Sequence, residues 1–302
     1  MELTDWHKSG KFFEFRKFQI YYNEKFDPSK QKESLLLIHG FPTASWDFHS
    51  IWNDLSEQFN LITLDMIGFG FSEKPSHFPY SIHEQANLIE DLLVFKGIKN
   101  FHILCHDYGV TVAQELLARF EDSKSKMTIE SSNLSPNINS IAFLNGGLFP
   151  ETHRPRFVQK LLISPIGFLI SHLLTKEKFA KSFSEVFGTN KPSPREIDDF
   201  WNLIQYNKGQ ALAHKHIRYM KERKIYRPRW VGALLKTKLP LVLINGPADP
   251  ISGLHMVEHY RNLKTDSKII MLADTVGHYP QVEDPGAVTS AYLSFINTLR
   301  IP

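Results

Sequence analysis

The chain has 302 residues, of which 42% are hydrophobic and 13% aromatic, so it is long and apolar enough to bury one large core or two small ones. A formal net charge of +3 is too small to indicate binding to nucleic acid, and the single cysteine, Cys105, excludes an internal disulfide. The N-terminus contains acidic residues and lacks an apolar h-region, so we expect no signal peptide and a cytoplasmic protein.

Short apolar runs alternate with amphipathic stretches along most of the chain. The segment 12–24 alternates apolar and polar residues and predicts an antiparallel edge hairpin. Six nearly continuous apolar runs predict strands that are covered on both faces: 34–40, 60–65, 100–107, 139–147, 239–246 and 267–274. Helical periodicity occupies 48–58, 82–96, 110–120, 253–263 and 286–299. This alternation predicts an α/β fold with a doubly wound, mostly parallel sheet.

The alternation stops after the strand 139–147. Only helical patterns follow, around 155–175, 176–188, 195–206 and 208–222. The sequence therefore predicts a core made of residues 1–147 and 231–302, interrupted by an inserted helical cap at 148–230. The polar segment 123–137 predicts a surface loop within the core.

The most apolar stretch, 157–174, bears on membrane association. It contains Lys160, Pro165 and His172, and it therefore fits a pair of amphipathic helices better than a membrane span. The basic run 221–229 predicts a solvated helix end, and a phosphate-binding or membrane-surface patch is the alternative. We expect no integral membrane segment.

Residues with catalytic chemistry follow several of the predicted strands, at the carboxyl ends where open α/β sheets bind ligands. The segment CHDYG places Asp107 at a strand-to-helix turn, either as a nucleophile on a strained elbow or as an ordinary helix N-cap. Asp249 follows the strand within 239–246, and His278 follows the last strand. The chain order nucleophile, acid, histidine is that of α/β hydrolases, which favours the elbow.

The segment His39-Gly40-Phe41 follows the strand within 34–40. A glycine turn there directs the Phe41 N–H into the site, where it forms a two-donor oxyanion hole with the N–H of Tyr108. An ordinary turn between a strand and a helix is the alternative interpretation.

These motifs resemble the epoxide hydrolase and haloalkane dehalogenase branch of the α/β hydrolases, whose elbow carries an aspartate. Longer segments are similar to the mesoderm-specific transcript protein family along nearly the whole chain, among them LLLIHGFPTASWDF, IGFGFSEKP, NGGLFPETHRP and HYPQVEDP. The resemblance implies an α/β-hydrolase fold with Asp107, His278 and Asp249 as catalytic residues. The hydrophobic N-terminal segment of the animal proteins is not expected in this chain.

An aspartate nucleophile restricts the substrate. A carboxylate that attacks an sp³ carbon forms an alkyl ester, whereas attack on an ester or amide would form an anhydride. The chain contains no G-x-S-x-G motif, which disfavours a serine esterase. We therefore expect a small apolar electrophile as the substrate, an epoxide or an alkyl halide, and neither a metal nor an organic cofactor. His278, held by Asp249, would activate the water that hydrolyses the ester.

The two electrophiles need different helper groups. The resemblance implies two cap tyrosines that donate a proton to an opened epoxide, and Tyr219 is the candidate donor, although 148–190 contains no tyrosine. Tyr108 and Phe41 stand where the dehalogenase relatives have halide-binding groups, which favours the epoxide. A dehalogenase-like enzyme and a non-enzymatic signalling or binding scaffold are the alternatives. His153 and Arg154 are expected at the cap hinge, and the sequence predicts no oligomeric state.

Overall fold

A computed structural model describes residues 1–126 and 136–300. Most of the predicted surface loop, 123–137, lies outside the described residues. The prediction is wrong at its first residues, because the helix α4 (Tyr108–Lys126) continues through them. It is also wrong at its last residue, since Asn137 begins a strand.

The strands form one eight-stranded sheet in the order β1-β2-β4-β3-β5-β6-β7-β8. The first three strands in this order, β1, β2 and β4, pair antiparallel, and every later pair of neighbouring strands is parallel. The strands are β1 Lys11–Phe15, β2 Phe18–Lys25, β3 Glu33–Ile38, β4 Phe59–Leu64, β5 Asn100–Cys105, β6 Asn137–Phe143, β7 Leu241–Asn245 and β8 Ile269–Met271. The predicted edge hairpin and the mostly parallel sheet are both confirmed.

Alternate residues of each central strand enter different apolar cores. In β3, Leu36 and Ile38 pack on one face, whereas Leu35 and Leu37 pack on the other. Four helices cover the first face: α3 (Ile82–Phe95), α4, α11 (Arg227–Lys236) and α12 (Leu254–Leu263). Three helices cover the second: α1 (Leu3–Ser9), α2 (Trp52–Gln58) and α14 (Pro285–Leu299). Because both faces of these strands are buried, most residues in them are apolar, and this explains the continuous apolar runs in the sequence.

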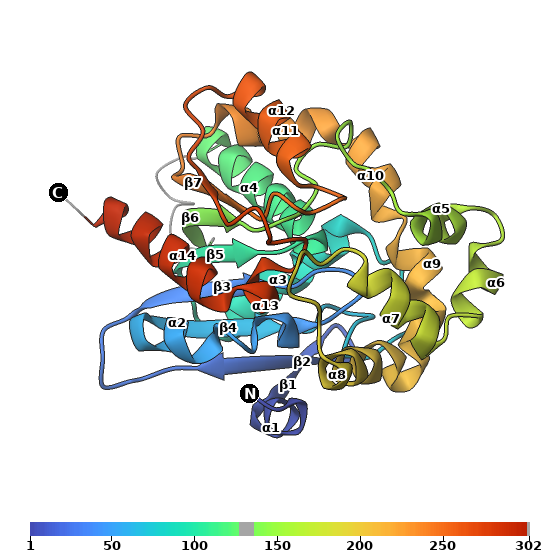
Figure 1. The fold of residues 1–302 in the computed structure, drawn as a ribbon. Coiled ribbons are helices and arrows are strands. Elements are labelled where there is room, and N and C mark those ends of the chain that lie inside the picture. The colour runs from blue at the N-terminus through green and yellow to red at the C-terminus, as the bar shows by residue number, and fades with distance from the viewer. Residues whose placement is uncertain (127–135, 301–302) are drawn as a thin grey trace.

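The segment between β6 and β7 contains helices and no strand. These are α5 Phe157–Ile163, α6 Gly167–His172, α7 Lys176–Ser184, α8 Pro194–Gln205, the 3₁₀ helix η2 Tyr206–Leu212, α9 Ala213–His216, α10 Tyr219–Ile225 and α11. Figure 1 shows α5 to α9 grouped on the side of the molecule opposite the C-terminal end of the chain. They form the inserted helical cap of the fold.

Local sequence determines where the cap helices begin and end. The predicted stretch 155–175 is divided into α5 and α6 by Pro165, which disfavours helix continuation. The helix α8 begins where Ser193 and Glu196 form a capping box. None of the helices in the described ranges is long and apolar enough to cross a membrane.

The predicted cap boundary at residue 230 falls inside α11. This helix packs on α4, and the indole N–H of Trp230 donates to the Glu115 carboxylate at 2.7 Å. Most of α11 therefore has core neighbours rather than cap neighbours. The division of the chain at 147/148 and 230/231 stays a prediction.

Candidate active site

Asp107 occupies a sharp turn between β5 and α4. Its φ angle of 45° lies in the left-handed region, which is unfavourable for a residue with a side chain. Two hydrogen bonds hold the turn: the Asp107 N–H donates to the Asn145 carbonyl at 2.9 Å, and the Gly109 N–H donates to the His106 carbonyl at 2.8 Å. The Asp107 side chain is thereby presented above the end of the sheet, as the elbow pattern predicts.

Glycines make this close approach possible. A Cβ atom at Gly109 would lie 2.4 Å from the backbone oxygen of Ile38, and one at Gly40 would lie 2.9 Å from the Cβ of Asp107. Neither position can hold a side chain without displacing the elbow. The small residues around Asp107 therefore position it against the ends of β3 and β5.

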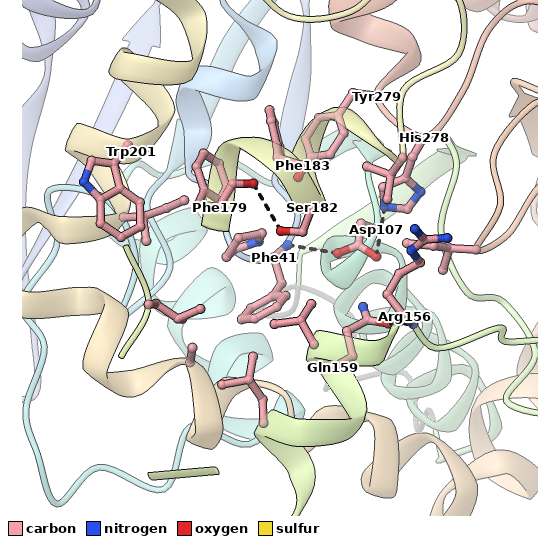
Figure 2. A pocket seen from close by; sticks show the side chains of 18 residues that line it. Phe41, Asp107, Arg156, Gln159, Phe179, Ser182, Phe183, Trp201, His278 and Tyr279 are labelled. Atoms are coloured by element: carbon pink, nitrogen blue, oxygen red, sulfur yellow. Dashed lines mark hydrogen bonds and ion pairs between the residues drawn. The ribbon is translucent and has the colours of Figure 1, made fainter. Parts of the chain in front are cut away.

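The structure brings Asp107, His278 and Asp249 together from three separate loops. The His278 Nδ1 lies 2.8 Å from Asp249 Oδ2, and its Nε2 lies 3.6 Å from Asp107 Oδ1. All three side chains are buried. Figure 2 shows His278 turned toward Asp107 at one end of a pocket. The imidazole thus bridges two carboxylates, and its Nε2 faces the space beside the elbow.

Asp249 is held by several donors besides His278. Its Oδ2 accepts from Asn145 Nδ2 at 3.0 Å and from Ser252 Oγ at 2.7 Å, and its Oδ1 accepts from the Ile251 N–H at 2.7 Å. Asn145 also exchanges hydrogen bonds with the backbone of Gly246. The orientation of the acid is therefore fixed by the end of β6 and by its own loop.

Electrostatics keep these groups charged despite their burial. Burial lowers the pKa of His278, but the Asp249 and Asp107 carboxylates outweigh burial and raise that pKa to about 10. Burial raises the pKa of Asp107, but His278, His106 and the Phe41 N–H overcome this effect and leave it below its ordinary value. The pKa of Asp249 is strongly lowered, because His278, Ser252 and Asn145 outweigh its burial. At neutral pH, His278 is therefore an imidazolium ion between the carboxylates of Asp107 and Asp249.

The two predicted oxyanion-hole residues, Phe41 and Tyr108, are placed differently relative to the site. The Phe41 N–H donates to Asp107 Oδ2 at 3.0 Å, so this N–H faces the carboxylate directly. The Tyr108 side chain is buried in the core, where its ring packs against the rings of Phe69 and Tyr219. Tyr108 can therefore contribute only its backbone N–H, and its hydroxyl does not line the pocket.

The pocket in front of Asp107 is mainly apolar. It has an empty volume of about 790 Å³, part of which is open to solvent. Asp107, His278 and Tyr279 lie on its core side, and most of the remaining walls come from the cap. The apolar cap side chains are Val158, Leu162, Leu174, Phe179, Phe183, Val186, Trp201, Ile204 and Ala213. Such walls favour a small apolar ligand.

Comparisons with known proteins agree with this architecture. A family model described as the alpha/beta hydrolase fold matches residues 33–285. The mesoderm-specific transcript protein of Mus musculus is 41% identical over 307 residues, covering 98% of this chain and 88% of the mouse protein. The chain belongs to the mesoderm-specific transcript family of α/β hydrolases.

Two further matches to this family member are more distant. A protein of Mycobacterium tuberculosis named putative hydrolase LipZ is 34% identical over 264 residues, covering 87% of this chain and 88% of that protein. The solved structure of a haloalkane dehalogenase DbeA-M1 loop variant from Bradyrhizobium elkanii matches with a TM-score of 0.76, covering 96% of each chain. At 17% identity, that likeness concerns the fold alone.

The cap of this family member brings Tyr219 toward the site without placing it on the pocket wall. Tyr219 is buried on α10, and burial, followed by the Asp107 carboxylate, raises the pKa of its hydroxyl. The Arg223 guanidinium beside it opposes this shift. Tyr219 therefore stays protonated and lies within the electrostatic influence of Asp107.

His153 and Arg223 form a polar pair that the sequence analysis did not place at the site. The Arg223 Nη1 lies 3.4 Å from His153 Nδ1, and the Nε2 of His153 has no partner among the described residues. Burial and Arg223 lower the pKa of His153 to about 3, while Asp107, His278 and Asp249 also act on it. His153 is thus a neutral imidazole close to the candidate site rather than only a hinge residue.

Sequence reasoning also missed residues that support the loops of the site. His106 donates through Nε2 to the His278 carbonyl at 2.7 Å, which ties the histidine loop to the elbow. Asp47 accepts from the Gly40 N–H and from Thr43 Oγ1, and so it holds the His39-Gly40-Phe41 turn. The only sequence signal for these supporting roles is that His106 and Gly40 lie within the recognised motifs. Within the described ranges, no group of three His, Cys, Asp or Glu residues could hold a metal ion.

Proposed function

We propose that this chain is a hydrolase in which Asp107 attacks carbon and forms a covalent alkyl ester with a small apolar epoxide. The observation that carries the proposal is the placement of the Asp107 carboxylate at the strained elbow, between the Phe41 N–H and His278 Nε2. A carboxylate held in this way is ionised at neutral pH and faces an apolar pocket. These are the properties of a nucleophile rather than of a helix cap.

In the first step, one carboxylate oxygen of Asp107 forms a bond to an epoxide carbon, and that carbon's bond to the ring oxygen breaks. The ring oxygen becomes an alkoxide, which takes the hydroxyl proton of Tyr219 once that hydroxyl, which lies near Asp107 but behind the described pocket wall, comes within reach of the substrate. His153 is a second neutral group near Asp107 with an unused polar atom. The alkyl ester that results carries no charge on Asp107.

In the second step, water attacks the ester carbonyl while His278 removes its proton. Esterification removes the Asp107 charge that helps to hold the pKa of His278 near 10, so that pKa falls. The imidazolium then gives up its proton, which restores the Tyr219 hydroxyl, and the neutral imidazole becomes available as a base. The oxyanion formed on Asp107 would be stabilised by the N–H groups of Phe41 and Tyr108. As it collapses, the departing alkoxide takes the remaining proton of the attacking water, which releases the diol and restores the Asp107 carboxylate, while His278 keeps the first proton.

An epoxide is favoured over an alkyl halide because a departing halide needs N–H donors around it. Among the described residues that line the pocket, Trp201 alone has an indole N–H, and Figure 2 shows it at the opposite end of the pocket from Asp107. Tyr108, next to Asp107, points into the core. The other N–H donor side chains that the cap contributes to the described pocket wall are Arg156 and Gln159, so a departing halide would depend on these two groups rather than on the side chain that follows Asp107 in the sequence.

The source of the new product oxygen tests the proposal. The enzyme, in excess over an aryl-substituted epoxide, is allowed one turnover in heavy-oxygen water, and the diol is analysed by mass spectrometry. An unlabelled diol after one turnover, with label appearing in Asp107, supports the ester. A labelled diol would make Asp107 a general base and exclude the covalent route. Halide release from bromoalkanes, or no turnover of either class, would support the dehalogenase or the scaffold instead.

A further inference from the structure

A group of large apolar side chains is exposed on the outer surface of the cap. Phe157 on α5, together with Ile166, Phe168, Leu169 and Leu173 on or beside α6, has exposed fractions between 52% and 76%. We call these five residues the α5–α6 face. One third of the large hydrophobic side chains that are exposed in the described chain lie in this one short segment. Figure 1 shows α5 and α6 at the outer side of the cap, away from the sheet.

Positive charge surrounds the α5–α6 face. Between residues 154 and 181, the basic residues are Arg154, Arg156, Lys160, Lys176, Lys178 and Lys181, whereas Glu177 is the single acid. A groove beside Phe168 is lined on its other side by His214, Arg218 and Lys221. Within the described residues, no carboxylate pairs with Lys160, Arg218 or Lys221, so these charges are available to an external anion.

We propose that the α5–α6 face docks on the surface of an anionic phospholipid bilayer. The five apolar side chains would enter the boundary between headgroups and acyl chains, while Lys160, Arg218 and Lys221 would contact lipid phosphates. Short helices that combine exposed apolar residues with basic ones bind membranes in this interfacial manner. Both helices are far too short to span a bilayer, so the docking is peripheral.

The charge distribution selects a lipid surface over a second copy of the chain. Two copies that met through this face would bring their lysines and arginines together, which is unfavourable. A bilayer with anionic headgroups complements both the apolar centre and the basic surroundings. The docking is independent of the proposed chemistry, and it assigns a role to apolar residues that are more than half exposed.

The same helix connects this face to the pocket. Phe157 on α5 is exposed, while Val158 and Leu162 on α5 line the pocket that contains Asp107. Docking would therefore place one wall of the pocket against the lipid. An apolar molecule dissolved in the bilayer would then need to pass only α5 to enter the pocket.

Vesicle binding tests the docking. The variant Asp107→Asn, which removes turnover from the measurement, is sedimented with sucrose-loaded vesicles of phosphatidylcholine alone or with about 30 mol% phosphatidylserine, which supplies an anionic surface. We expect binding to the anionic vesicles that weakens when salt is raised. Adding Phe168→Ser with Leu169→Ser should reduce binding more than tenfold. Lys160→Ala and Lys221→Ala should each reduce it roughly fivefold, because a basic residue near the surface contributes about that factor.

The control carries two serine substitutions at exposed apolar positions elsewhere, Val94 and Leu254. It should bind as the parent does, and all variants should keep the parent's circular dichroism spectrum and Tm. Failure of the parent to bind either vesicle, or equal loss in the control, would overturn the docking. Vesicle-free dimers that Phe168→Ser with Leu169→Ser abolishes would assign the face to a second copy and overturn it as well.

Discussion

The carbonyl of Asn145 accepts the hydrogen bond of the Asp107 N–H at 2.9 Å, while the Asn145 side chain donates to Asp249 at 3.0 Å. One residue at the end of β6 thus links the strained elbow to the acid that holds His278. Asn145 is fully buried, so water cannot replace these hydrogen bonds if they are broken. The elbow and the acid loop therefore depend on one another.

Replacing this side chain should affect stability and activity together. We expect Asn145→Ala to lower the free energy of unfolding by about 1–3 kcal/mol, because Asp249 and the Gly246 backbone lose buried partners. Ester hydrolysis should slow more than ester formation, since Asp249 acts through His278. Urea denaturation and rapid-quench kinetics measure the two effects. Asn297→Ala, at an exposed position on α14, should change stability by less than about 0.5 kcal/mol.

The two steps of the proposed reaction should separate by mutation. His278→Gln should react once with an epoxide and stall, because the ester forms without the imidazole but water needs a base to attack it. Intact-mass spectrometry should then show the mass of one substrate on the peptide that contains Asp107. Asp107→Asn should carry no adduct. An adduct on another residue in His278→Gln would disprove the assignment of the nucleophile.

The charge of His278 should depend on Asp107. With its pKa raised to about 10, the imidazole should stay protonated at pH 8, and ¹⁵N NMR of the ring nitrogens reports this directly. Asp107→Asn should lower that pKa, because one of the two carboxylates is removed. The raised pKa stabilises the fold fully below pH 6.5, and this contribution should disappear as the pH rises through about 10. An unchanged pKa in Asp107→Asn would show that Asp249 alone holds the proton.

Tyr219→Phe should slow the opening of the epoxide without slowing hydrolysis of the ester. The hydroxyl stays protonated because burial and Asp107 raise its pKa, so it can donate a proton across the working range. A lost general acid reduces a rate by about 10²-fold or more. Single-turnover measurements of ester formation give the effect. Tyr260→Phe, at a buried tyrosine on α12, controls for the loss of a hydroxyl, and equal slowing in both variants would remove Tyr219 from the mechanism.

The elbow should not tolerate a methyl group at Gly109. A Cβ there would lie 2.4 Å from the Ile38 backbone oxygen, which cannot move away as a flexible side chain could. Gly109→Ala should therefore cost more than about 2 kcal/mol of stability. Gly232→Ala is the matched control, because its Cβ meets nothing within 4 Å on the helix α11. We expect the control to be neutral or to stabilise by up to about 1 kcal/mol in thermal denaturation.

The sheet was largely predictable from the sequence because burial on both faces leaves continuous apolar runs such as that of β3. The hairpin of β1 and β2 was visible through its alternation. The short helix α1 was not predicted, since Leu3 and Trp6 alone give too little periodicity to detect. The cap was expected to be helical, but its end could not be placed from the sequence, because α11 is held to the core by a tertiary contact, the hydrogen bond from Trp230 to Glu115.

The site was predictable where a residue sits in a motif next to a strand end. Asp107, Asp249 and His278 met that condition, and the structure places them in contact. The linking role of Asn145 was not predictable, because its two hydrogen-bonding partners lie about 40 and 100 residues away in sequence. The pairing of His153 with Arg223 requires the path of α10, which no local pattern specifies.

The three loops of the site emerge from the ribosome far apart in time. The elbow lies between β5 and α4, whereas Asp249 follows β7 and His278 follows β8, close to the end of the chain. A nascent chain therefore lacks both the acid and the histidine until most of it has been made, and the three side chains can meet only after the last strand has joined the sheet. Late completion of the last strand makes regained turnover a direct reporter of the final folding event.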